Sequence, residues 1–156
     1  MKVKIGDIVE VQTSAGLAYA LYAHRHSKPP KYGAMIRVFQ QIYASRPTDV
    51  AEVTTDRVRF TTFFPLQAAV DKHLVEIVGN VPVPEHLQTF PLFRVAGLAN
   101  PQTKRVDNWW LWDGETEWRI GTLSQEQRKL QIRGVWNYTL LVEQIVHGWC
   151  PENDRR

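Results

Sequence analysis

The chain has 156 residues, which suits one folded domain with a sizeable core and leaves no comfortable room for two. Its 44% hydrophobic, 11% aromatic and 22% charged residues exclude a disordered, fibrous or membrane-embedded chain. A net charge of +3, from 19 Lys and Arg against 16 Asp and Glu, is too mild to imply a nucleic-acid or membrane partner.

The first half of the chain is typical of an antiparallel meander. Residues 5–12 are β-branched and nearly alternating, which predicts a strand, and residues 17–26 and 33–43 predict the next two. The paired prolines within 28–31 predict an exposed loop between the second and third strands, because they remove two backbone donors.

The middle of the chain predicts shorter elements. The polar, turn-rich residues 44–56 predict a loop before a strand over 57–64. Apolar residues at helical spacing then predict a short helix over 66–73, followed by a strand over 75–78. The prolines between 79 and 100 allow only short elements, with a turn or two of helix.

Residues 108–121 carry the clearest local pattern. Asp113-Gly114 between alternating segments predicts a two-residue hairpin turn, which places Trp112 opposite Glu115 and Trp109 opposite Trp118. One face of this hairpin then carries Trp109, Leu111, Thr116, Trp118 and Ile120. The other face mixes large aromatics with charges: Trp110, Trp112, Glu115, Glu117 and Arg119.

The last third of the chain predicts two helices. Ser124-x-x-Gln127 matches a capping box and predicts a short helix over 124–130. Asn137 as N-cap and an apolar stripe predict a helix over 138–147 that stops at a glycine. Residues 151–156 are predicted to form a frayed tail.

These patterns together predict one α+β, mainly β domain. We expect either a curved antiparallel sheet or a partly open barrel, with about three short helices. The acidic residues Asp7 and Glu10 interrupt any signal-like apolar stretch, and no run of about 18 apolar residues occurs. The single Cys150 fits a reducing compartment and favours a small, partly buried side chain over a nucleophile. We therefore expect a cytoplasmic protein with no membrane partner.

Two groups of residues could support catalysis. An H-x-H pair on a strand, His24 and His26, projects two imidazoles to the same side about 7 Å apart, where they could share a metal. Because catalytic zinc normally has three protein ligands, solvated histidines are the favoured interpretation, and no cofactor is expected. Glu115 and Glu117 could divide acid and base roles, but the adjacent Arg119 favours a solubilising function. No phosphate-loop, dinucleotide or nucleophile-elbow motif occurs.

Two other features could support binding. The basic residues within 24–31 could contact phosphates, but they span a single loop, so a nucleic-acid partner is not favoured. Trp110 and Trp112 suit a protein contact, because aromatic residues bury a large area with few rotatable bonds. The alternative is that helix 138–147 or a loop covers this face and makes it a second core, and both interpretations stay open.

Several stretches together resemble the bacterial immunity protein 26 family, whose members occur beside toxin genes in polymorphic toxin systems. The stretches are KIGDIVEV at 4–11 with Tyr19-Ala20, VEIVGNVPVPEHL at 75–87, WWLWDGE at 109–115 and IGxLSxEQRKL at 120–130. The resemblance implies a mainly β domain over residues 1–150 that binds a cognate toxin and neutralises it without catalysis. It transfers no site residues.

Three functional hypotheses follow. The first is an immunity protein whose partner-binding residues are Trp110, Trp112, Glu115, Glu117 and Arg119. Because some relatives carry a phosphotriesterase label, the second is a metal-assisted hydrolase that uses His24 and His26. The third and weakest is a nucleic-acid-binding β module.

Overall fold

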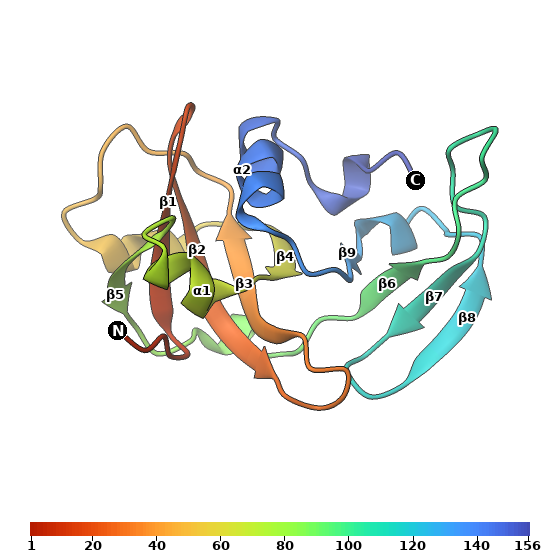
Figure 1. Ribbon diagram of the computed structural model, residues 1–156, viewed down its shortest axis with the longest axis horizontal. Coiled ribbons are helices and arrows are strands. Elements are labelled where there is room, and N and C mark those ends of the chain that lie inside the picture. Colours follow the sequence, from red (N-terminus) through yellow and green to blue (C-terminus); the bar gives the residue numbers. More distant parts are fainter.

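Two β-sheets form the framework of the computed structural model, which describes all of residues 1–156 (Figure 1). The first sheet has the strand order β4-β3-β2-β1-β5 and the second has the order β8-β7-β6-β9. The first comprises β1 Asp7–Thr13, β2 Gly16–His26, β3 Gly33–Phe39, β4 Val58–Phe63 and β5 Glu76–Asn80. The second comprises β6 Phe93–Ala96, β7 Trp109–Trp112, β8 Glu117–Gly121 and β9 Gln131–Ile132. All pairings are antiparallel except that of β6 with β9.

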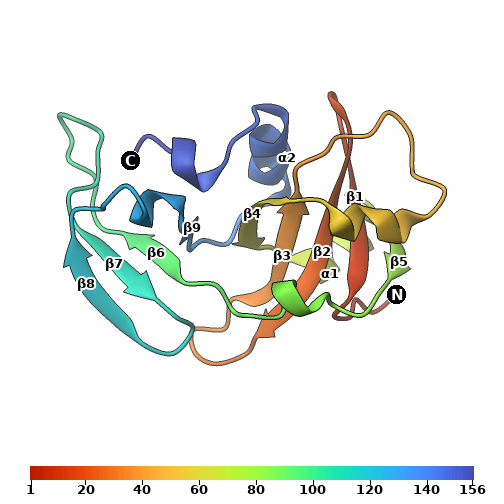
Figure 2. The same ribbon diagram turned by 180° about the vertical axis from the view of Figure 1, so that it is seen from behind.

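Short helices cover both faces of the first sheet. The α-helices are α1 Leu66–Asp71 and α2 Tyr138–Val146, and the 3-10 helices are η1 Val50–Thr55, η2 Glu85–Leu87, η3 Gln127–Lys129 and η4 Pro151–Asn153. Figure 1 shows α1 and α2 on one side of this sheet, and Figure 2 shows η1 and η2 on the other. No helix combines the length and the apolarity that a membrane crossing requires.

The α+β, mainly β class is confirmed, with the strands divided between two sheets that do not close on themselves. The four predicted strands of the first half correspond to β1 to β4. The third is shorter than predicted: it ends at Phe39, and Tyr43 returns only as an isolated bridge to Leu17. The predicted helices at 66–73 and 138–147 are present with ends displaced by one or two residues.

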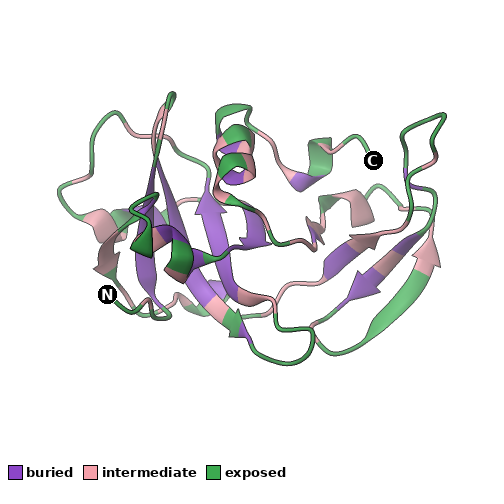
Figure 3. Ribbon diagram, viewed as in Figure 1, coloured by how far each residue is buried: buried purple, intermediate pink, exposed green.

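Each face of the first sheet has its own apolar cluster, because neighbouring residues of a strand point to opposite faces. The face under α1 and α2 includes Val9, Ala20, Ile36, Val38, Phe60, Leu141 and Ile145. The face under η1 and η2 carries Ile8, Tyr19, Leu21, Phe39, Val53 and Leu87. A third cluster joins the two sheets and consists of Ala23, Met35, Phe63, Phe93 and Trp112. Figure 3 shows β1 to β4 as mostly buried, whereas β5 is only partly buried.

Two segments are more ordered than the sequence predicts. Within 44–56, predicted as a loop, Asp49 caps η1 by accepting a hydrogen bond from the Ala51 N–H at 3.2 Å, and Val53 is fully buried. Residues 151–156 are not a frayed tail: η4 begins there with Pro151 buried, and Trp149 Nε1 donates to Asp154 at 3.2 Å.

The predicted capping box is present, but its helix is shorter than predicted. Ser124 N–H donates to Gln127 Oε1 at 2.9 Å, and Gln127 N–H donates to Ser124 Oγ at 3.2 Å. Only the single turn η3 follows, because the chain becomes extended at Leu130 and pairs as β9 with β6.

Candidate functional site

The β7–β8 hairpin turns through Asp113 to Thr116, two residues more than predicted. Trp112 pairs with Glu117 and Trp110 with Arg119, so the predicted pairing of Trp112 with Glu115 is wrong. The Asp113 carboxylate explains the wider turn, since it accepts hydrogen bonds from the N–H groups of Glu115 and Thr116 at 2.9 and 2.8 Å. These bonds lower the pKa of Asp113, so the carboxylate stays ionised in its acceptor role.

Gly114 fits this turn for two reasons. Its φ of +100° lies in the region that favours glycine, and a Cβ atom there would come within 3.0 Å of the Phe90 ring. The turn therefore packs directly on the segment that leads into β6. Because the register slips by two residues on one strand, the side chains that stay in that strand keep their faces, and Glu115 and Thr116 become part of the turn.

Trp112 is buried in an aromatic cluster. Only 5% of it is exposed, and its ring lies 5.0 Å from His26, 5.3 Å from Tyr32 and 5.5 Å from Phe90, measured between ring centroids. Its prediction as an exposed partner contact is therefore wrong. The second-core interpretation holds for this residue, and the covering residues come from the end of the first sheet and from loops rather than from α2.

The exposed tryptophan of the hairpin is Trp118, which the sequence placed on the inner face with Trp109 and Leu111. Trp109 and Leu111 are buried, whereas 39% of Trp118 is exposed. The reason is position in the sheet: β7 lies between β8 and β6, but β8 is the outer strand (Figure 3). A sequence signal existed, since charged residues flank Trp118 on both sides. Trp110 is half-buried.

The charged residues of the hairpin are held by partners. Glu115 forms an ion pair with Lys28, Glu117 forms one with Arg133 at 2.8 Å, and Arg119 donates to the Asn108 side chain. The Arg133 guanidinium also lies over the Trp112 ring, 5.1 Å from its centroid. These surface pairs contribute little stability, but they orient Glu117 and Arg119, which point to the opposite face of β8 from Trp118.

The predicted histidine pair lies beside the hairpin turn. His24 and His26 line a pocket of about 350 Å³ together with Phe90 and the turn residues, so the structure brings both histidines close to Glu115. Their ring centroids are 6.5 Å apart. Nowhere in the chain do three or more His, Cys, Asp or Glu side chains come close enough to hold a metal, so the hydrolase hypothesis lacks a ligand set.

His26 is not the solvated residue that the sequence favours. It is 4% exposed, surrounded by aromatic rings, and its Nε2 has no hydrogen-bond partner. Burial lowers the pKa of His26, and the nearby Lys28 charge lowers it further. Burial also lowers the pKa of His24, and the charges of His26 and Arg37 lower it further. Both imidazoles thus favour the neutral form.

Of the remaining sequence candidates, Cys150 lies apart from the histidine pocket, whereas the basic segment 24–31 borders it. Cys150 is a half-buried residue at the start of η4, in agreement with its prediction as a small packed side chain. Within the basic segment 24–31, Lys28 is paired with Glu115, and Arg25 lines the pocket.

Comparisons with known proteins add no identification. A scan against protein-family models, a search of curated proteins and a search of solved structures each found no match. The resemblance to the immunity protein 26 family therefore stays a prediction.

Proposed function

We propose that this protein is a cytoplasmic, non-enzymatic immunity protein that binds a partner toxin and neutralises it. The observation that supports the proposal most is the exposure of Trp118 on the outer strand of the second sheet. We define the outer hairpin surface as the exposed residues of the turn and of β8, which are Glu115, Glu117, Trp118 and Arg119. Trp118 lies on one face of β8 and Glu117 and Arg119 lie on the other, so a partner contacts them by wrapping around the free edge of this strand.

This surface has the physical features of a protein contact. Trp118 offers a large apolar area with few rotatable bonds, and tryptophan and arginine are the residues most enriched among energetically dominant contacts. The flanking charges are oriented in advance, so less conformational entropy is lost on binding. β8 pairs only with β7, so its free edge can also accept an extended strand of a partner.

The surface differs from the sequence prediction in its aromatic residue. Glu115, Glu117 and Arg119 remain, Trp118 replaces Trp112, and the half-buried Trp110 contributes at most its exposed part. The proposal therefore assigns Trp112 to stability and Trp118 to binding.

The test is co-expression of the chain with the toxin domain encoded beside its gene, followed by calorimetry on the purified pair. We expect restored colony growth, a 1:1 complex, and at least a tenfold increase in Kd for Trp118→Ala, about 1.4 kcal/mol. Leu98→Ala is the matched control, because Leu98 is 96% exposed on a different loop.

Two results would contradict the proposal at different levels. If Trp118→Ala and Arg119→Ala bind as tightly as the original chain, the outer hairpin surface is wrong while the function stands. If no complex forms at micromolar concentration and growth is not restored, the function itself is wrong. Stoichiometric zinc in the purified protein, with phosphotriester turnover lost in His24→Ala, would replace the proposal with the hydrolase hypothesis.

A further inference from the structure

A second cavity, of about 580 Å³, opens between β4 and the C-terminal segment and shares no lining residue with the pocket at the hairpin. Its volume is in the range of small-molecule sites. Three cationic residues line it, Arg57, Arg59 and Lys129, whereas Glu152 is the only carboxylate in its wall. The cavity therefore carries a net positive lining.

Arg59 is held in this wall by backbone hydrogen bonds and has no ion-pair partner. Its Nη1 donates to the Ile145 carbonyl at 2.9 Å, and its Nη2 donates to the Gln40 carbonyl at 2.8 Å. Neither Arg59 nor Arg57 forms an ion pair, and Lys129 has only a long contact of 3.4 Å with Glu126. The remaining guanidinium N–H groups of Arg59 are thus available to a ligand in a fixed orientation.

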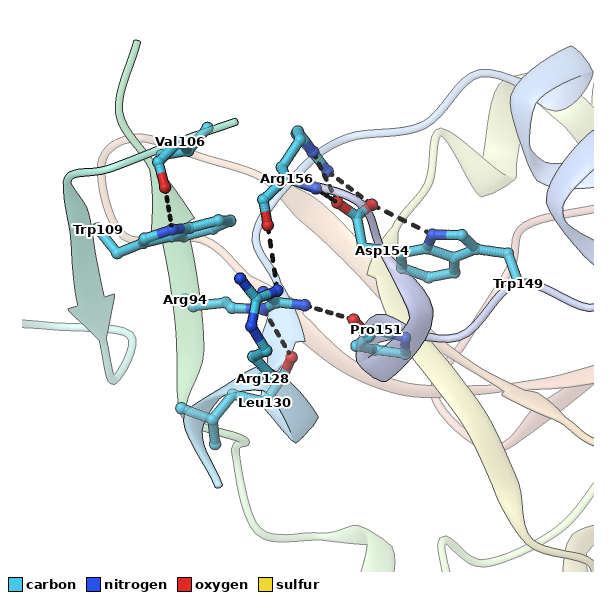
Figure 4. A network of polar contacts seen from close by, with 9 residues as sticks. All are labelled: Arg94, Val106, Trp109, Arg128, Leu130, Trp149, Pro151, Asp154 and Arg156. Carbon is cyan, nitrogen blue, oxygen red and sulfur yellow. Dashed lines mark hydrogen bonds and ion pairs between the residues drawn. The ribbon is translucent and has the colours of Figure 1, made fainter. Parts of the chain in front are cut away.

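A further positive charge lies behind the same wall. Arg94 is fully buried, its Nη2 donates to the carbonyl of the lining residue Pro151, and its Nη1 has no partner (Figure 4). Asp154 forms no ion pair with Arg94 and is instead engaged by Arg156 at 3.0 Å and by Trp149. In a low-dielectric surrounding an unpaired guanidinium raises the local positive potential, which attracts anions into the adjacent cavity.

The lining also indicates which anion fits. None of its residues is aromatic, so the cavity has no stacking platform for a nucleobase. Guanidinium groups match the oxygen geometry of phosphate, and several cations around one cavity suit a ligand with more than one negative charge. The Gln131 side chain adds an amide, whose Oε1 already accepts from the Thr61 N–H at 2.7 Å and whose NH₂ donor has no protein partner.

We propose that this cavity binds a compact phosphate anion of the pyrophosphate type through Arg57, Arg59 and Lys129. The inference is independent of toxin binding, because it concerns different residues and a different part of the surface. The three cationic side chains bind the phosphate groups, and any organic part of the ligand remains outside the cavity.

The experiment is isothermal titration of the full chain with inorganic pyrophosphate at low and at near-physiological salt. The double variant Arg57→Gln, Lys129→Gln removes two exposed cations and is expected to weaken binding at least tenfold. The matched control is Lys104→Gln, Arg105→Gln, which makes the same charge change on an exposed loop elsewhere and is expected to leave the affinity within about twofold.

Parallel titrations with inorganic phosphate and adenosine diphosphate define the ligand class. We expect orthophosphate to bind more weakly than pyrophosphate, and adenosine diphosphate to bind no more tightly. Equal weakening in the two double variants would show nonspecific attraction and overturn the proposal, as would no binding at millimolar pyrophosphate. A tenfold preference for adenosine diphosphate would overturn the ligand class. Trp118→Ala is expected to leave pyrophosphate binding unchanged, which separates this site from the outer hairpin surface.

Discussion

His26 and Arg94 are two buried polar side chains whose hydrogen-bonding capacity is not fully used. Each is buried with one nitrogen that has no hydrogen-bond partner, Nε2 in His26 and Nη1 in Arg94. Burial lowers the pKa of Arg94 to about 10, because no carboxylate pairs with it directly. The Arg94 guanidinium instead lies 4.9 Å from the centroid of the Trp109 ring and donates through Nε to the Leu130 carbonyl at 3.3 Å. Both residues are therefore held by aromatic packing more than by charge pairing.

The lowered pKa values of His24 and His26 predict acid sensitivity. In the folded state both imidazoles favour the neutral form, whereas the unfolded chain takes up protons at the ordinary histidine pKa of about 6.5. The free energy of unfolding should be highest above that pH and should fall as the pH decreases from it toward the lower folded-state pKa. Urea unfolding at a series of pH values between about 8 and 5 measures this dependence.

The variant His26→Phe tests the origin of the acid sensitivity. Phenylalanine fits among aromatic rings and removes the unpartnered Nε2, so the free energy of unfolding at neutral pH should stay the same or rise by about 1 kcal/mol. The pH dependence should become shallower, with His24 as the remaining contributor. An unchanged slope would show that His26 does not cause it.

At the level of single elements, side-chain hydrogen bonds set where the hairpin turn and α2 begin. The hairpin turn follows the Asp113 carboxylate, and α2 begins where the Asn137 side chain accepts the Leu140 N–H at 2.8 Å. A side-chain cap precedes both α2 and η3, and the two helices differ in the residues that follow it. α2 continues because Leu141 and Ile145 pack on the first sheet, whereas η3 stops after one turn at a segment that enters a strand.

The cap of α2 gives a prediction for this element. Asn137→Ala leaves the Leu140 N–H without its side-chain acceptor, so the free energy of unfolding should fall by about 1 kcal/mol. Asn137→Asp keeps an acceptor oxygen at the same place and should stay within about 0.5 kcal/mol of the original chain. Chemical denaturation measures the free energy of unfolding of the two variants. Equal decreases in both would mean that packing alone fixes the start of α2.

At the scale of the whole molecule, the aromatic cluster joins the two sheets. Trp112 and Phe93 of the second sheet pack against Phe63 and Met35 of the first, and Phe63 lies 5.5 Å from Phe93 between ring centroids. β4 adds backbone contacts to the chain beyond β9, since the Phe63 N–H donates to the Gly134 carbonyl at 3.2 Å. We expect the two sheets to unfold together for this reason.

A pair of tryptophan variants tests this arrangement. Trp112→Ala leaves a cavity in the aromatic cluster between the sheets and should lower the free energy of unfolding by about 3–5 kcal/mol. Trp118→Ala removes a side chain that is already 39% exposed and should lower it by less, about 1–2 kcal/mol. Circular dichroism and hydrogen exchange should follow a single transition in the original chain. Two separate transitions, or equal losses in the two variants, would contradict the proposed coupling.

Local sequence patterns predict most of the strands, the helix at 138–147 and the position of the glycine-containing hairpin turn. These features depend on periodicity, capping and turn chemistry, which act over a few residues. The same patterns also indicate the hairpin and the histidine pair as candidate functional residues. The predicted register of the hairpin is wrong, and His26 is buried although it was predicted to be solvated.

Which faces of these elements are covered depends on contacts between segments that are distant in the sequence. Trp112 is buried and Trp118 is exposed because β7 is a central strand and β8 an outer one, which depends on the pairing of β7 with β6. In the same way, Arg57, Arg59 and Lys129 meet around one cavity although about 70 residues of chain separate the first two from the third. Burial and charge clustering arise from contacts between distant segments, and local patterns do not contain that information.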